Sequence, residues 1–148
     1  MEQYIRDQKI DSLYEGTTHI QALDLFFRKI ARDGGATLQG LMGDIQKTLK
    51  AAGEIDELAR EKAALERAVG DVGSILMTMM KKVPESVYHV GFHGNRILMA
   101  LAETVIGWRL LQQSVVAHGK IPHASEKDKV FYEGKLASTR FFLSLIHI

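Results

Sequence analysis

The sequence predicts an all-α protein, folded as an antiparallel helical bundle, on three observations. Apolar residues recur at helical spacing along almost the whole chain. Alternating runs of β-branched residues, which indicate strands, are nearly absent. Both prolines, Pro84 and Pro122, fall where helical patterns stop. The chain has 148 residues, 46% of them hydrophobic. This is enough for one domain with a core, in which short connections place neighbouring helices antiparallel.

Composition and charge exclude several classes of function. The formal net charge of +1 gives no electrostatic case for binding nucleic acid or an anionic membrane. Cysteine is absent, which excludes disulfides, thiol catalysis and cysteine metal sites and fits a reducing compartment. The most apolar stretch, 97–117, is interrupted by Glu103 and Arg109, so we expect a buried helix there and no membrane contact. The charged first ten residues do not have the pattern of a signal peptide.

The N-terminal part predicts two helices separated by a break. A short helix is expected over about 2–13, and the break covers 14–17. Thr18 and Gln21 have the spacing of a capping box, with Thr18 as the N-cap. The apolar positions of the second helix are Ile20, Leu23, Phe27 and Ile30. The glycines of the sequence Asp-Gly-Gly at 33–35 end this helix.

Two longer helices are expected to follow. The first covers about 36–51 and stops near Gly53. Its apolar side consists of Leu38, Leu41, Ile45 and Leu49. The second covers about 54–82, and its apolar residues alternate steps of three and four, which is an a/d seam. The seam positions are Ile55, Leu58, Lys62, Leu65, Val69, Val72, Leu76 and Met79.

The last two helices enclose a proline-containing loop at 119–124. The first of them, about 86–118, is apolar around much of its circumference, which is typical of a helix in the middle of a bundle. We expect Trp108 in the core and Arg109 paired with an acid. Ser125 and Asp128 can cap the final helix. Its apolar residues are Val130, Phe131, Leu136, Phe141 and Phe142.

His89 and His93 have the four-residue spacing of a metal-binding pair. No acidic residue lies between them to complete a site, so we interpret both as packed or surface residues and expect no metal. Gly91 and Gly94 are interpreted as positions where helices cross closely.

The stretch SLYEGTTHIQ, residues 12–21, raises the question of chemistry. Gly16 allows backbone conformations closed to other residues. A carboxylate near a helix N-terminus is stabilised as the anion, typically by about 0.3–1 kcal/mol. The neighbouring glycine and the helix N-terminus therefore explain Glu15 as a solvated acid at a turn, and they leave a catalytic role open.

The longer run RDQKIDSLYEGTTHIQALDLFFRKI, residues 6–30, resembles the acyl-CoA dehydrogenase family. The family pattern is Arg-Asp-x-Lys-Ile, a short apolar step, Tyr-Glu-Gly-Thr and then Ile-Gln. The matching residues are Arg6, Asp7, Lys9, Ile10, Tyr14, Glu15, Gly16, Thr17, Ile20 and Gln21. The stretch FYEGKLASTRFF, 131–142, is similar to the closing helix of the C-terminal extension in the larger members. Its matches are Phe131, Tyr132, Lys135, Arg140 and Phe141.

The resemblance implies that Glu15 is the base that removes the α-proton of an acyl-CoA thioester. The β-hydrogen leaves as hydride to FAD, which gives a trans-2-enoyl-CoA. Such chemistry needs an unpaired carboxylate in a dry site beside a hydrogen-bonded thioester carbonyl. The resemblance places Tyr14 and Gly16 against the substrate. It places four residues along the FAD: Thr17, Thr18, His19 and Gln21.

The resemblance also divides the chain. Residues 1–33 correspond to the end of the catalytic C-terminal domain, and residues 34–148 to the helical extension. Most flavin and substrate contacts should come from segments before Arg6, so the isolated chain is expected to be inactive. Residues 143–148, LSLIHI, lack the expected polar ending and are interpreted as truncated or non-native.

The implied partners are acyl-CoA, an electron-transfer flavoprotein or similar acceptor, and further copies in a homo-oligomer. The implied location is the bacterial cytoplasm or the mitochondrial matrix. The alternative is a non-enzymatic helical bundle module that mediates oligomer assembly.

Overall fold

The computed structural model describes residues 2–10 and 17–146 of the chain. These residues form helices and no strands, which confirms the all-α prediction. The α-helices are α1 (Glu2–Lys9), α2 (Thr18–Asp24), α3 (Ala36–Ala52), α4 (Ala59–Lys82), α5 (Tyr88–Lys120) and α6 (Glu126–Leu145). Shorter pieces are the π-helix η2 (Leu25–Ile30) and the 3₁₀ helices η3 (Asp56–Leu58) and η4 (Ile121–His123).

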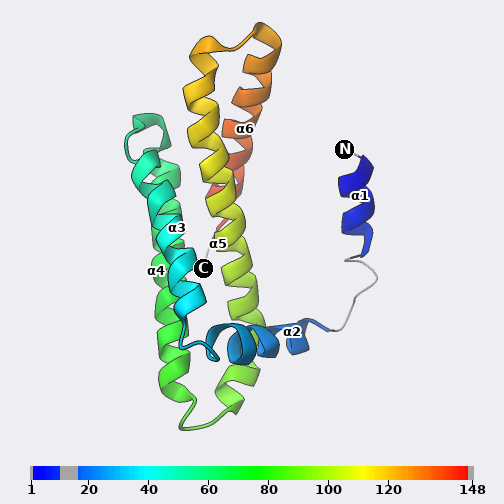
Figure 1. The fold of residues 1–148 in the computed structure, drawn as a ribbon, viewed down its shortest axis with the longest axis vertical. Helices are drawn as coiled ribbons and strands as arrows, with labels where there is room; N and C mark the ends of the chain where they lie inside the picture. Colours follow the sequence, from blue (N-terminus) through cyan, green and yellow to red (C-terminus); the bar gives the residue numbers. More distant parts are fainter. Residues whose placement is uncertain (1, 11–16, 147–148) are drawn as a thin grey trace.

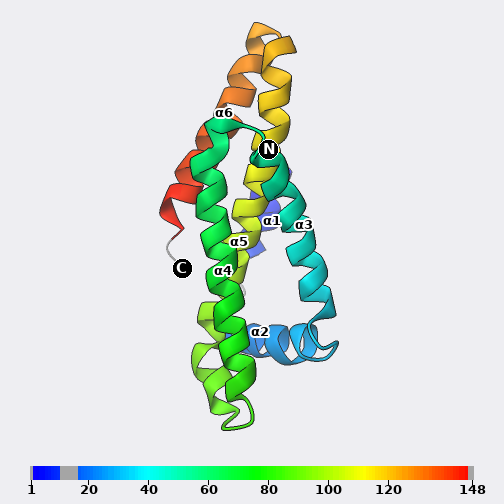
Figure 2. The ribbon, with the colours of Figure 1, turned by 90° about the vertical axis from the view of Figure 1, so that its left-hand side faces the viewer.

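The helices α3 to α6 form the antiparallel bundle, with α5 as its longest member (Figure 1). α2 runs across one end of the bundle, and both Figure 1 and Figure 2 show it lying crosswise to the long helices. α1 stands apart from the bundle in Figure 1 and has no buried residue. In the part of the chain that is described, no helix is both long and apolar enough to cross a bilayer.

Two apolar clusters hold the bundle together. The first joins α2 and η2 to α4 and α5, and its largest side chain is the buried Phe26. The second joins α3, α4, α5 and α6 around Trp108 and Leu111. The indole N–H of Trp108 donates to Thr48 Oγ1 at 2.8 Å, which satisfies its one polar group. Both clusters therefore depend on α5, which agrees with its predicted central position.

The a/d seam predicted for 54–82 is confirmed by burial. Leu58, Leu65, Val72, Leu76 and Met79 are all buried. Lys62, the polar member of the seam, is half-buried, and its ammonium pairs with the carboxylate of Glu66. The preceding helix, α3, ends as predicted at Gly53, which is its C-cap.

The apolar face predicted for the second helix is confirmed at two of its four positions, since Ile30 is buried and Leu23 is half-buried. It is wrong at Ile20, which is 66% exposed, and at Phe27, which is also exposed, while Ala22 and Phe26 are buried. Phe27 lies in the π-helical segment, in which the N–H of Ala31 bonds to the carbonyl of Phe26, five residues earlier. Five-residue hydrogen bonds change the angular spacing of side chains, so an α-helical periodicity no longer predicts the buried face.

The final helix also differs from expectation. Its cap is confirmed, because Ser125 Oγ accepts the N–H of Asp128 at 3.3 Å. However, Val130, Phe131 and Phe141 are 60–70% exposed. The fully buried positions of α6 are Thr139 and Leu143, while the predicted Leu136 and Phe142 are half-buried and pack against the second cluster. The predicted loop at 119–124 is largely helical as well, since α5 continues to position 120 and η4 follows directly.

The predicted acidic partner of Arg109 is replaced by two other contacts. Its guanidinium donates to Gln112 Oε1 at 2.9 Å and lies 4.8 Å from the centre of the Trp108 ring. A cation over an indole face is itself favourable, so the arginine needs no carboxylate there.

Candidate active-site segment

The catalytic residue predicted from the sequence lies outside the described part of the chain. Tyr14, Glu15 and Gly16 belong to the stretch 11–16, whose structure is not described. The residues on either side of it, Ile10 and Thr17, are described. Thr17 directly follows the stretch and stands at the start of α2.

The start of α2 differs from the predicted capping box. Thr17 is the N-cap residue, and Thr18, the predicted N-cap, is already the first helical residue. The side chain of Thr17 makes no capping hydrogen bond. Instead the backbone N–H of Gln21 donates to the carbonyl of Thr17 at 3.0 Å, which closes the first turn. The helix therefore begins one residue earlier than a capping box would set it.

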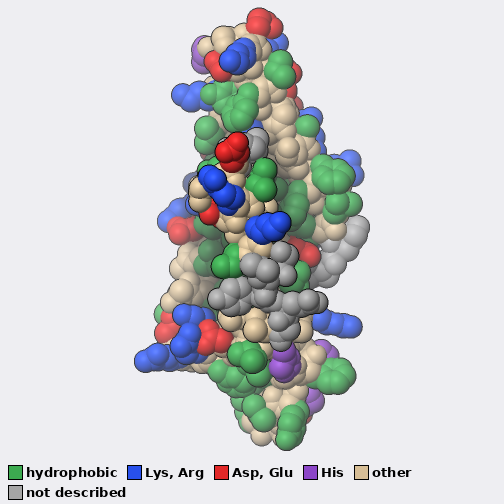
Figure 3. All heavy atoms as spheres, turned by 90° about the vertical axis from the view of Figure 1, so that its right-hand side faces the viewer, with side chains coloured by type: hydrophobic (Ala, Val, Ile, Leu, Met, Phe, Trp, Pro, Cys, Tyr) green, Lys and Arg blue, Asp and Glu red, His purple; other side chains and the backbone are tan. Residues whose placement is uncertain are grey.

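The predicted cofactor-binding residues share this end of α2 and face solvent. Thr17 is half-buried, while Thr18, His19 and Gln21 are exposed. The four side chains supply two hydroxyls, an imidazole and an amide, all able to donate hydrogen bonds. Figure 3 looks onto the side of the molecule that carries α1, and shows basic and acidic side chains interspersed there. No single-sign field dominates this face, in agreement with the small net charge.

A close crossing with α5 sets the position of α2. Ala22 is 1% exposed and packs against Gly94. A Cβ atom added at Gly94 would lie 3.3 Å from the Ala22 Cβ, inside the ordinary carbon–carbon contact distance. This confirms the predicted crossing at Gly94. The same prediction is wrong for Gly91, where an added Cβ would meet no atom within 4 Å.

The first motif residues lie on α1, where Arg6 and Asp7 both bond to Gln3. Gln3 Nε2 donates to Asp7 Oδ1 at 2.7 Å, and Arg6 Nη2 donates to Gln3 Oε1 at 3.2 Å. All three side chains are exposed. The described contacts of Arg6 and Asp7 are therefore local to α1 and do not join this helix to the bundle.

The histidine pair is arranged as surface and packed residues. His89 is half-buried, and His93 is exposed with its ring 5.4 Å from that of Phe92. Across 2–10 and 17–146, no three histidine or acidic side chains are grouped so that they could hold a metal ion.

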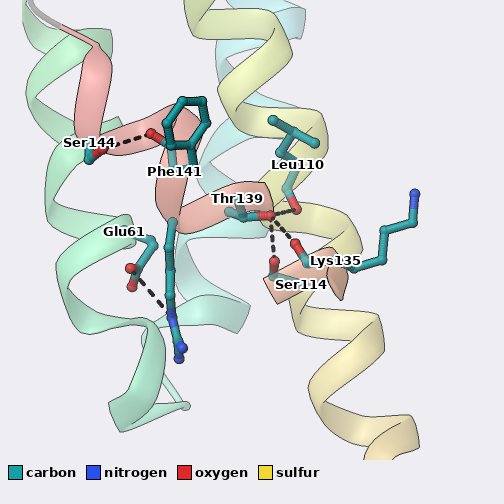
Figure 4. A network of polar contacts seen from close by, with 8 residues as sticks. Glu61, Leu110, Ser114, Lys135, Thr139, Phe141 and Ser144 are labelled. Carbon is teal, nitrogen blue, oxygen red and sulfur yellow. Dashed lines mark hydrogen bonds and ion pairs between the residues drawn. The ribbon is translucent and has the colours of Figure 1, made fainter. Parts of the chain in front are cut away.

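A polar network between α5 and α6 was not predicted from the sequence (Figure 4). Ser114 Oγ donates to Thr139 Oγ1 at 2.7 Å. The Thr139 hydroxyl lies 3.0 Å from the carbonyl oxygens of both Leu110 and Lys135 and shares its single proton between them. Ser114 and Thr139 are fully buried. The only signal in the sequence was a polar residue on the apolar side of each helix.

A second missed feature is a buried acid on α4. Glu61 is 6% exposed, and its carboxylate points toward α6 in Figure 4. It directly precedes Lys62 of the seam. The spacing of apolar residues did not distinguish it from the exposed acidic residues of the same helix.

The described residues define an all-α helical bundle, and comparison with known proteins identifies its family. Residues 41–146 match the family described as "Acetyl-CoA dehydrogenase C-terminal like". The chain belongs to this family.

Three relatives have acyl-CoA dehydrogenase names. A broad-specificity linear acyl-CoA dehydrogenase of Mycobacterium tuberculosis is 43% identical over 96% of this chain. A butyryl-CoA dehydrogenase of Syntrophomonas wolfei is 31% identical over 93% of this chain. A 3-methylmercaptopropionyl-CoA dehydrogenase of Ruegeria pomeroyi is 32% identical over 95%. The chain spans only 23–24% of the length of these relatives and aligns with their C-terminal part.

Proposed function

We propose that this chain is the C-terminal portion of an FAD-dependent acyl-CoA dehydrogenase and that Glu15 is its catalytic base. Family membership and the names of three relatives support the class of enzyme. The Glu-Gly-Thr motif, directly before α2, supports the assignment of the base. The family match over residues 41–146 supports the class of enzyme, and the motif supports the base, because the local sequence alone would also explain Glu15 as an acid at a turn.

The residues of this chain would perform the proton half of the reaction. Glu15 takes the α-proton of the acyl-CoA thioester, and Tyr14 and Gly16 lie against the substrate. When FAD is bound, it accepts the β-hydrogen as hydride. A carboxylate is the appropriate base here because desolvation by the substrate raises its pKa toward that of a proton acceptor working near neutral pH.

The described part of the site fits one wall of an FAD pocket. Thr17, Thr18, His19 and Gln21 offer hydrogen-bond donors, and exposure leaves three of them accessible to a ligand. The crossing at Gly94 holds α2 firmly against α5. Because the chain spans about a quarter of its relatives, the remaining walls would come from other segments of a longer protein. We therefore expect the isolated chain to purify without flavin absorbance and to be inactive.

The proposal includes partners and location. Acyl-CoA is the substrate, an electron-transfer flavoprotein or similar acceptor reoxidises the flavin, and the enzyme is a homo-oligomer. The location is the bacterial cytoplasm, or the mitochondrial matrix in a eukaryote.

The test is the substitution Glu15→Gln in a flavin-containing protein. This is either a longer gene product or a chimaera in which residues 1–148 replace the aligned C-terminal part of the mycobacterial relative. The variant should keep its FAD, since the amide preserves the shape of the side chain, but lose exchange of the substrate α-proton with solvent. Proton exchange at the unchanged rate would rule out Glu15 as the base.

One observation favours the alternative, a helical module for oligomer assembly. Phe92, Met99 and Ile106 are 86%, 52% and 48% exposed. They are spaced seven residues apart on α5 and so form one apolar stripe. If the module acts only in assembly, the molar mass of the chain should fall to that of a monomer when Phe92 and Met99 are both replaced by serine. Replacement of Glu15 should then have no consequence for any activity.

A further inference from the structure

Glu61 is a buried carboxylate with incomplete pairing. Its side chain is 7% exposed, and its nearest cation is Arg140, whose Nε lies 3.8 Å from Oε1. That distance is an ion pair without a hydrogen bond. The other oxygen, Oε2, is buried and has no hydrogen-bond partner among the described residues. Since buried polar atoms are nearly always hydrogen-bonded, an oxygen in this state indicates a missing donor.

The same carboxylate lines a hollow between α4 and the second half of α6. The hollow has a volume of about 420 Å³, within the range of small-molecule sites. Its charged lining consists of Arg60, Glu61, Arg67, Asp71 and Arg140. Three guanidinium groups against two carboxylates leave one excess positive charge. Leu143, Ile146 and two alanines supply its apolar part.

The arginines and the Glu61 carboxylate require different groups on a bound molecule. Guanidinium groups recognise phosphate and carboxylate groups by paired hydrogen bonds, so Arg60, Arg67 and Arg140 favour an anion. Glu61 Oε2 in turn requires a hydrogen-bond donor. A single water molecule would satisfy Oε2 but would leave the excess positive charge of the lining unbalanced.

We propose that this hollow is a binding site for a small phosphorylated molecule that also carries a hydroxyl or amino group. The phosphate lies among the arginines, and the hydroxyl or amine donates to Glu61 Oε2. The site is on α4 and α6, whereas the proposed catalytic segment precedes α2. Binding therefore does not require flavin or the rest of an enzyme.

The proposal is tested on the 148-residue chain by calorimetric titration with AMP, with adenosine and inorganic phosphate as separate probes. Ionic strength is held constant because salt screens exposed charges. AMP should bind with a dissociation constant of about 1 mM or lower, and adenosine and phosphate should each bind at least about tenfold more weakly. Absence of AMP binding in this range overturns the proposal. Equal binding of adenosine overturns it as well, because the arginines would then have no role.

Three variants assign the contacts. Arg67→Gln should weaken AMP and phosphate alike by about tenfold, whereas Arg32→Gln, the same charge change at an exposed turn outside the hollow, should weaken neither. Glu61→Gln should weaken AMP but leave phosphate binding unchanged or tighter, since it removes both an acceptor and a repelling charge. If Glu61→Gln leaves AMP binding unchanged, water satisfies the carboxylate and the proposal fails. Equal effects of the two arginine substitutions would show non-specific attraction and would also refute it.

Discussion

Two glycines on α5 give a matched test of how α2 is held. Gly91 and Gly94 lie three residues apart on the same helix, and only Gly94 faces Ala22. Replacing a helical glycine by alanine restricts the unfolded chain and stabilises the helix by about 0.5–1 kcal/mol. Gly91→Ala should show this gain in full, because an added Cβ there meets nothing within 4 Å.

Gly94→Ala adds a steric cost to the same gain. The new Cβ would lie 3.3 Å from the Ala22 Cβ, closer than the optimum of about 3.5–4.0 Å for two carbons. An alanine Cβ cannot rotate away, so α2 itself must shift, and overpacking of this kind costs about 1–3 kcal/mol. We expect Gly94→Ala to be less stable than Gly91→Ala by about 1–3 kcal/mol.

Urea denaturation followed by circular dichroism measures both variants against the parent chain. For a protein of this length each kcal/mol also moves the melting temperature by about 2–4 °C. Gly94→Ala should melt below Gly91→Ala. If both alanines stabilise the chain equally, the crossing does not hold α2, and the positioning argument for the motif residues is wrong.

Three further predictions concern the described residues. Thr48→Val removes the acceptor of the buried Trp108 N–H and should destabilise the fold by about 1–3 kcal/mol, which fluorescence of the single tryptophan measures directly. Leu111→Ala empties a fully buried position and should cost about 2–5 kcal/mol in the same urea titration. Hydrogen bonds from the Thr37 hydroxyl and N–H lower the pKa of Asp33. Its stabilisation is therefore full above the usual aspartate range near about pH 4 and lost as pH falls through the lower folded pKa. The stability difference between Asp33→Asn and the parent should accordingly shrink on acidification, and a difference independent of pH would contradict the assignment.

Long, regular periodicity made most of the bundle predictable. The seam of α4 was identified position by position, because Leu58 through Met79 follow an unbroken alternation of three and four. A turn was equally predictable where its backbone conformation favours one residue type. Gly34 and Gly35 have φ of 65° and 86°, a conformation that favours glycine, and they form the predicted turn between η2 and α3.

The errors arose where tertiary packing decides between equivalent local patterns. The π-helical segment turned Phe27 outward and Phe26 inward, and single-sequence periodicity assumes α-helical spacing. The exposed aromatics of α6, such as Phe131, show that an apolar residue on a helix need not face the core of this chain.

The candidate site divides in the same way. The motif around Glu15 could be identified from residue types alone, because its pattern is long and specific. The buried Glu61 could not, since one acid among several on a helix has no distinguishing spacing. Only the approach of α6 excludes solvent from it and brings Arg140 within 3.8 Å.

Anaerobic mixing with acyl-CoA tests the central claim most directly. The flavin absorbance of the longer protein or chimaera is followed for the parent and for Glu15→Gln, each loaded with FAD. The account predicts rapid bleaching in the parent and essentially none in the variant, with equal flavin content in both. Equal bleaching in the two proteins would show that Glu15 is not the base, and that the motif before α2 serves the helical module in some other way.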